Sequence, residues 1–112
     1  MSNLFSGQRT VTAAATAVSL DSLIRGAPGA NQPAAYTGSP IGVALNFSAS
    51  VDLYVGVDST VTNTSGGFLL PAGVSWTDYA IGQFGNAIDL TQFYVYAPAG
   101  SDATVSVYFR AL

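Results

Sequence analysis

The sequence predicts an all-β fold, a single-domain antiparallel β-sandwich of jelly-roll-like form with about seven or eight short strands. Three observations predict it. Short apolar runs with a period of two recur along the chain, turn residues separate them every ~8–12 positions, and no segment has the apolar spacing of a long helix. The chain has 112 residues, a usual length for one domain and enough for one core.

The N-terminus is expected to be an arm. Residues 1–8 show no periodicity, whereas residues 9–112 carry the pattern of the sandwich domain. Leu4 and Phe5 are apolar residues in a polar tail, which indicates docking onto a partner. A frayed terminus is the alternative interpretation.

A strand, a short ambiguous segment and a long loop follow. Residues 9–20 are rich in Thr, Val and Ala, and their β-branched members favour a strand. Residues 20–26 fit either one helical turn ended by Gly26 or the end of a strand. Residues 26–40 are a loop rich in Gly and Pro whose one large side chain is Tyr36. Loops of this length are uncommon in compact domains, so this one is expected to contact a partner or to be a flexible connection.

The middle of the chain predicts several strands. Residues 41–49 and 51–57 alternate strictly, with a turn or kink expected at 48–50 between them. The side chains expected on the buried face are Ile41, Val43, Leu45, Phe47, Val51, Leu53, Val55 and Val57. Residues 68–70 are expected to be a short buried run, and Trp76 is expected to belong to the core.

The end of the chain gives the clearest strand pair. Residues 90–97 and 103–111 alternate in type, and the Pro-Ala-Gly-Ser-Asp segment 98–102 is typical of a turn between them. One face of this pair is apolar and the other carries Tyr, Thr, Ser and Arg. We therefore expect the two strands to form a hairpin that completes a sheet.

The residue types that are missing exclude most enzyme chemistry. The chain contains no Lys, Glu, His or Cys, and its charged residues, three Arg and six Asp, make up 8% of the sequence. An ordinary soluble domain has about 25%. General acid–base and nucleophilic catalysis recruit mainly the absent types, so we expect no enzyme activity and no cofactor. A surface with so little charge also resists aggregation poorly, which indicates that other subunits cover part of it. The alternative is an extracellular or surface-exposed protein whose composition has drifted toward neutrality.

A metal site is not expected either. Zinc would lack its preferred Cys and His ligands. Asp52, Asp58 and Asn63 carry oxygen ligands suited to calcium, but their spacing matches no EF-hand loop. These residues are better explained as turn formers.

Charge and hydropathy also argue against nucleic acids and membranes as partners. The net charge is −3, and no cluster of Arg predicts a nucleic-acid groove or an anionic membrane surface. No apolar run reaches the ~18 residues of a membrane span. The N-terminus lacks a basic region followed by an apolar one, so no secretory signal is expected and the chain is predicted to be made in the cytoplasm.

Tyrosine is the main candidate for recognition. The residues predicted to form an interface share an aromatic or apolar side chain at an expected surface position: Leu4, Phe5, Tyr36, Tyr54, Tyr79, Tyr94, Tyr96 and Tyr108. Tyr on a face otherwise covered by Ser and Thr is common where sugars or proteins bind. The alternative is that the tyrosines are cross-strand pairs that stabilise a sheet.

A resemblance covers roughly residues 40–111. The residues that carry it are strand ends and turns: Tyr54-Val55-Gly56, Val61-Thr62, Ser65-Gly66, Leu69, Pro71-Ala72-Gly73 and Phe93-Tyr94-Val95-Tyr96-Ala97. In these the chain resembles small β-sandwich virion structural proteins of tailed bacteriophages, of the head decoration, cement or collar type. The resemblance implies a protein that is made in the host cytoplasm and located in the virion, with partners that are further copies of the chain and capsid or collar proteins. It implies no active site.

Two functions are therefore expected from the sequence. The first is a non-enzymatic structural virion protein that acts by multivalent protein–protein docking as a homo-oligomer on a symmetric lattice. The alternative is a carbohydrate- or receptor-binding module at a fibre tip, in which tyrosines stack on a glycan. A third reading, an extracellular matrix or pilus-like subunit, needs a secretion route that the sequence does not indicate.

Overall fold

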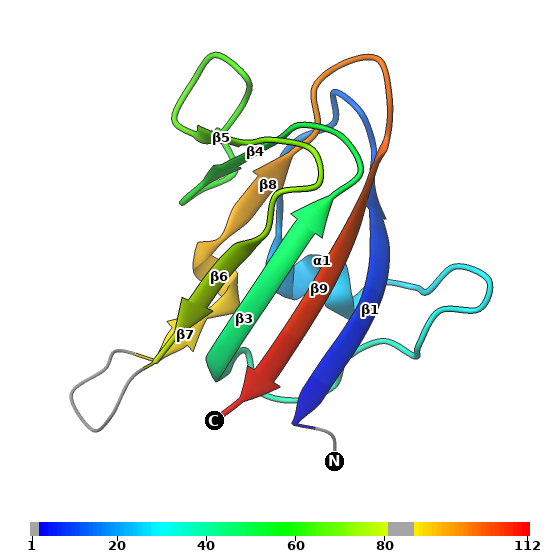
Figure 1. The fold of residues 1–112 in the computed structure, drawn as a ribbon, viewed down its shortest axis with the longest axis vertical. Helices are drawn as coiled ribbons and strands as arrows, with labels where there is room; N and C mark the ends of the chain where they lie inside the picture. Colours follow the sequence, from blue (N-terminus) through cyan, green and yellow to red (C-terminus); the bar gives the residue numbers. More distant parts are fainter. Residues whose placement is uncertain (1–2, 81–86) are drawn as a thin grey trace.

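The chain folds into two antiparallel β-sheets that pack face to face, as a computed structural model shows for residues 3–80 and 87–112 (Figure 1). Sheet A has the order β1 (Leu4–Val11), β9 (Ala103–Ala111), β3 (Ile41–Ala49) and β6 (Trp76–Tyr79), and β7 (Ile88–Asp89) also pairs with β3. Sheet B has the order β2 (Val18–Ser19), β8 (Tyr94–Tyr96), β4 (Leu53–Gly56) and β5 (Phe68–Leu70).

The strand order is that of a jelly roll. When the two-residue β7 is set aside, every connection except β4–β5 crosses from one sheet to the other. This alternation gives two four-stranded sheets with interleaved strand numbers, which is how jelly rolls are built. The predicted fold class, a single-domain antiparallel β-sandwich, is confirmed.

One short helix and the long loop close one side of the sandwich. Helix α1 (Leu20–Arg25) follows β2 directly, and the Ser19 hydroxyl caps it by accepting a hydrogen bond from the Ser22 N–H at 3.1 Å. The segment predicted as one helical turn or a strand end is therefore a helix, and the loop 26–40 follows it. A 3₁₀ turn, η1 (Leu90–Gln92), precedes β8.

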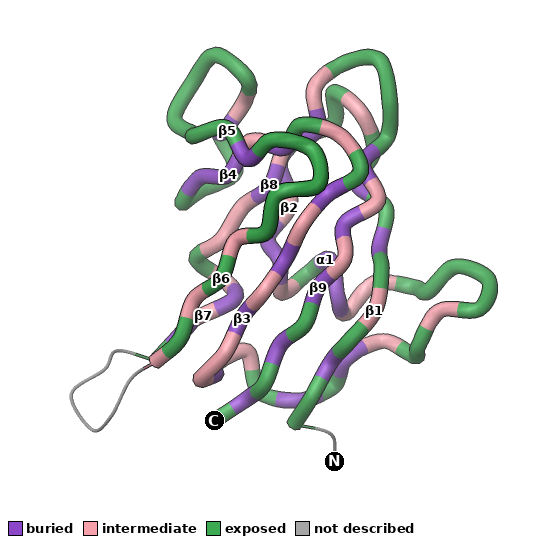
Figure 2. The backbone as a smooth tube through the Cα atoms, viewed as in Figure 1, coloured by how far each residue is buried: buried purple, intermediate pink, exposed green. Residues whose placement is uncertain are grey.

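The core lies between the sheets, and buried positions alternate along most of β1, β3 and β9 (Figure 2). Its largest fully buried side chains are Phe47, Phe109, Leu20, Ile24, Leu45, Leu53 and Leu90. The period-two pattern places the strand residues Phe47, Phe109, Leu45 and Leu53 inward, because successive side chains of a strand point to opposite faces of the sheet. Leu20 and Ile24 reach the core from helix α1, and Leu90 from the turn η1.

The first strands lie differently from the prediction. β1 begins at Leu4 and pairs with β9 along its whole length, so residues 4–8 belong to sheet A and are not an arm. The strand predicted over residues 9–20 is divided, because a turn at 13–15 separates β1 from β2. Ala14 takes a left-handed conformation there, with φ of 59°.

The prediction that the last two strands form a hairpin is also wrong. β8 lies in sheet B and β9 in sheet A, so residues 97–102 cross between the sheets. A turn sequence fixes a local reversal of the chain but not the partner of each strand. The kink expected at 48–50 is present, and it carries the chain from β3 into β4 of the other sheet.

Three expectations about burial are corrected. Val57 is 74% exposed because β4 ends at Gly56, before the alternation does. In β5, Phe68 and Leu69 are exposed and Leu70 alone is buried. Val43 is only half buried, since the register of β3 against β9 shifts between Gly42 and Ala44 and a bulge interrupts the alternation there.

Candidate interaction surfaces

The outer face of the strands β1, β9, β3 and β6 in sheet A is a broad polar surface with one charged residue, Arg110. The register aligns Ser6, Tyr108, Asn46 and Thr77 in one row across four strands, and the next row contains Leu4, Arg110, Ala44 and Tyr79. Hydrogen bonds join neighbouring strands on this face, from Asn46 to Thr77 at 2.7 Å and from Gln8 to Ser106 at 3.3 Å. Two predicted interface residues, Tyr79 and Tyr108, thus lie on one exposed surface.

The other three surface tyrosines lie on sheet B. Tyr54 of β4 is directly opposite Tyr96 of β8 on one side and Leu69 of β5 on the other. Tyr94 lies two residues along β8 from Tyr96, on the same face. None of the four strands of sheet B contains a charged residue. The predicted tyrosines therefore form two groups on opposite faces of the sandwich, and not one surface.

Two of the predicted interface residues are core residues. Phe5 and Tyr36 are both 4% exposed, and their rings meet edge to face with centroids 6.4 Å apart. Tyr36 also packs against Phe109 at 5.8 Å, and its hydroxyl donates to the Ser39 carbonyl at 2.8 Å. Neither side chain is available for docking. Leu4, in contrast, is 41% exposed at the start of β1.

The long loop is anchored to the domain by these contacts and by an arginine. Arg25 pairs with Asp21 at 2.8 Å and donates to the Gly38 carbonyl at 2.6 Å. Its guanidinium also lies 5.2 Å from the centre of the Tyr36 ring. The sequence predicts that residues 26–40 are a flexible connection or an arm that contacts a partner through Tyr36. These contacts contradict both predictions.

Asp58 is a turn former, as the sequence predicts, whereas Asp52 and Asp102 bind backbone groups far along the chain. Asp52 accepts a hydrogen bond from the Ala72 N–H at 3.0 Å, and Asp102 accepts one from the Ala13 N–H at 2.9 Å. The Thr60 hydroxyl and then the Thr60 backbone N–H donate to Asp58, and these bonds hold the pKa of Asp58 below its usual value. The carboxylates thus satisfy nearby backbone groups.

No metal-binding group emerges from the parts of the chain that the structure describes. Residues 3–80 and 87–112 contain no cluster of three or more His, Cys, Asp or Glu side chains. Across the same residues, no helix is long and apolar enough to span a membrane.

A partly exposed aromatic cluster that the sequence did not predict lies at the edge where β5 and β6 meet. Trp76 stacks at a tilt on Phe68, with ring centroids 4.9 Å apart, and touches Phe93 edge-on at 6.3 Å. These rings border an apolar pocket of about 320 Å³ together with Val55 and Val57. Trp76 is half buried and packs against the core, with its ring centroid 6.3 Å from that of Phe47, so the prediction that it belongs to the core is correct in part.

The signal for this cluster was present in the sequence but was misread. Phe68 and Trp76 flank the corner at Pro71-Ala72-Gly73, and a corner joins edge strands of the two sheets. An edge strand has no neighbouring strand on one side, so a large aromatic on it is partly left uncovered.

Comparison of the chain with family models, with curated proteins and with solved structures gives no match.

Proposed function

We propose that this protein is a non-enzymatic structural subunit of a virion, of the capsid decoration, cement or collar kind, that acts by docking its sheet faces on neighbouring subunits. One observation carries the proposal. Seven of the nine charged side chains hydrogen-bond within the molecule, and the two others in the described structure are Asp78 and Arg110. The outer sheet faces are thus almost free of charge.

This distribution suits a surface that becomes buried. Removing a charged group from water costs several kcal/mol unless it is paired, whereas an uncharged polar group needs only a replacement hydrogen bond. The cores of protein interfaces are accordingly poor in charged residues and rich in Tyr. The middle of sheet A carries Tyr108 opposite Asn46, with the uncharged Ser106 on the same strand.

The fold is compatible with the proposal without establishing it. Jelly rolls recur in viral capsid proteins and in lectins, and a fold alone does not define a function. The turn and strand-end residues that resemble phage virion proteins lie within residues 54–97, which run from β4 to the end of β8 and contribute strands to both sheets.

A charge placed on the outer face of sheet A tests the proposal. We expect Ser106→Lys to abolish co-sedimentation with phage particles that lack this protein, because the ammonium would have to be desolvated on docking. The matched control is Ser59→Lys in the exposed turn after β4, which should bind as the unmodified protein does. The proposal fails if the unmodified protein is a strict monomer with no affinity for such particles.

The second candidate function is glycan binding by the sheet B tyrosines. It is favoured by the direct pairing of Tyr54 with Tyr96 and by the absence of charge from that sheet, because aromatic faces stack on sugar rings. A glycan array decides between the two functions. A signal that disappears in Tyr54→Ala and Tyr94→Ala would favour glycan binding, and a blank array would contradict it.

A further inference from the structure

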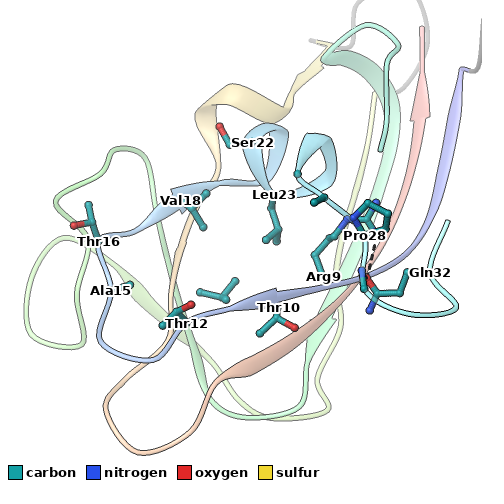
Figure 3. Close-up of a pocket in the computed structure, with 14 residues that line it drawn as sticks. Arg9, Thr10, Thr12, Ala15, Thr16, Val18, Ser22, Leu23, Pro28 and Gln32 are labelled. Carbon is teal, nitrogen blue, oxygen red and sulfur yellow. Dashed lines mark hydrogen bonds between the residues drawn. The ribbon is translucent and has the colours of Figure 1, made fainter. Parts of the chain in front are cut away.

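A cavity of about 480 Å³ opens between the β1 edge of sheet A and the α1 side of sheet B (Figure 3). Val18 and Leu23 line it from one side and β1 from the other, and the first residues of the long loop close one end. Its volume is within the range of small-molecule sites, ~300–1,000 Å³. The walls combine apolar side chains with a few polar groups, as such sites usually do.

Arg9 lies at the loop end of this cavity and is a buried charge without a counter-ion. Arg9 is 3% exposed. No carboxylate of the described residues pairs with it, because the ion pair among these residues joins Arg25 to Asp21. Its terminal nitrogens donate only to neutral oxygens, on Gln8, Gln32, Pro33 and Ala34. Its Nε is buried and has no partner.

Gln32 marks the point where an anion would be favoured. Its side-chain oxygen accepts a hydrogen bond from Arg9 Nη1 at 3.3 Å and another from the Gly29 N–H at 3.0 Å. A guanidinium from β1 and a backbone amide from the loop thus converge on one neutral oxygen. Charge-assisted hydrogen bonds are shorter and about twice as strong as neutral ones, so a carboxylate oxygen would be the better acceptor at this position.

We propose that the cavity binds a carboxylate attached to a small apolar group, with one carboxylate oxygen displacing the Gln32 amide from Arg9 and Gly29. The apolar group would lie against Val18 and Leu23. The ligand supplies the negative charge that is missing around Arg9. In the complex, the carboxylate and the guanidinium form a hydrogen-bonded pair with no net charge. This site is separate from the outer sheet faces and does not depend on the proposed docking function.

The charge of the site favours a carboxylate over a phosphate. One guanidinium compensates a single negative charge, and a phosphate with a charge near −2 would keep an uncompensated charge in a partly apolar cavity. The two sources of such a carboxylate are a free short-chain acid and the C-terminus of a peptide, which present the same group.

Titration with butyrate tests the site, followed by NMR of the Gly29 amide and the Arg9 Nε–H. We expect both signals to shift and saturate with butyrate, and we expect butyramide and inorganic phosphate to bind at least tenfold more weakly. N-acetyl-Ala-Leu as the free acid and as the amide distinguishes the sources: tighter binding of the peptide acid than of butyrate indicates a C-terminus, and weaker binding indicates a free acid.

Variants of Gln32 make the test specific. We expect Gln32→Ala to bind butyrate at least as tightly as the unmodified protein, because the competing acceptor is removed. Gln32→Glu should lose binding tenfold or more while remaining folded, because its own carboxylate occupies the site. The matched control is Gln8→Glu, which makes the same change at the exposed residue directly before Arg9 in the sequence. It should leave butyrate binding unchanged.

The proposal is overturned by any of three results. These are the absence of a saturating shift in both the unmodified protein and Gln32→Ala, equal affinity for butyramide and butyrate, and unimpaired butyrate binding by Gln32→Glu. Because Gln32→Glu adds an ion-pair partner to Arg9 and removes nothing from the core, its loss of binding cannot be ascribed to unfolding if its thermal midpoint equals or exceeds that of the unmodified protein.

Discussion

Tyr36 is predicted to fix the long loop to the core, so its removal should be far more damaging than removal of an exposed tyrosine. The side chain is 4% exposed and packs edge to face against Phe5 and Phe109. Truncation of a buried aromatic to Ala typically costs about 3–5 kcal/mol. For a domain of about this size, each kcal/mol lowers Tm by roughly 4–8 °C, so Tyr36→Ala should lose at least ~12 °C.

The contribution of the Tyr36 hydroxyl can be separated from that of the ring. Tyr36→Phe removes the 2.8 Å hydrogen bond to the Ser39 carbonyl and keeps the ring contacts, so we expect a loss of about 1 kcal/mol. The matched control is Tyr79→Ala, the same truncation at a residue 63% exposed on sheet A, where a change within about 0.5 kcal/mol is expected.

Urea unfolding followed by the fluorescence of Trp76, the single tryptophan, provides the free energies of unfolding. If Tyr36→Ala cost no more than Tyr79→Ala, the loop would contribute nothing to the core through this residue. The reasoning that assigns Tyr36 to the core would then be refuted.

Three further predictions follow from buried or hydrogen-bonded groups. Burial raises the pKa of Tyr36 above its ordinary value of 10.0 despite the opposing charge of Arg25, so stability that is complete below pH ~10 should fall as pH rises further, and less so in Tyr36→Phe. Gly42→Ala should cost about 1–3 kcal/mol by overpacking, because its Cβ would lie 2.4 Å from the Arg110 carbonyl oxygen; an unchanged urea midpoint would contradict this. The Asp58 carboxyl should titrate below its usual range by ¹³C NMR and return toward it in Thr60→Val, since the hydroxyl bond that lowers its pKa is lost.

The alternation of β3 and β9 could be read directly from the sequence. In β9 the buried and exposed positions alternate without a break, and in β3 the pattern fails only near Gly42, where the bulge lies. A bulge inserts one residue into the pairing and leaves no mark in the composition. The core face of these strands was therefore predictable, and the interruption at Val43 was not.

Tyr36 could not be placed from local sequence because its burial depends on contacts far along the chain. Its neighbours in sequence are small or turn-forming residues, which predict exposure. Its partners Phe5 and Phe109 lie at the two ends of the chain and become adjacent only when β1 pairs with β9. The pairing of β1 with β9 also places Phe5 in the core, and because of it residues 4–8 belong to sheet A and do not form the predicted arm.

The candidate surfaces were only partly predictable for a related reason. The five tyrosines of the strands were recognised, but their division between two faces depends on which sheet each strand joins. The cavity that Arg9 lines could not be predicted, because it depends on how the chain crosses from β1 to β2 and on how the loop packs. Neither feature has a local sequence signature. An arginine in phase with Val11 on the inner side of a strand was the one signal available.

The two outer faces suit different neighbours under the proposed function. In an isologous contact the same patch meets itself, so a charge near its centre would meet a like charge. The strands of sheet B contain no charged residue, and two copies of that face can approach without such repulsion. The outer face of sheet A carries Arg110, which favours a different partner that supplies a carboxylate or carbonyl oxygen. Screening by salt acts on exposed charges, so docking through sheet A would weaken at high ionic strength and self-association through sheet B would not.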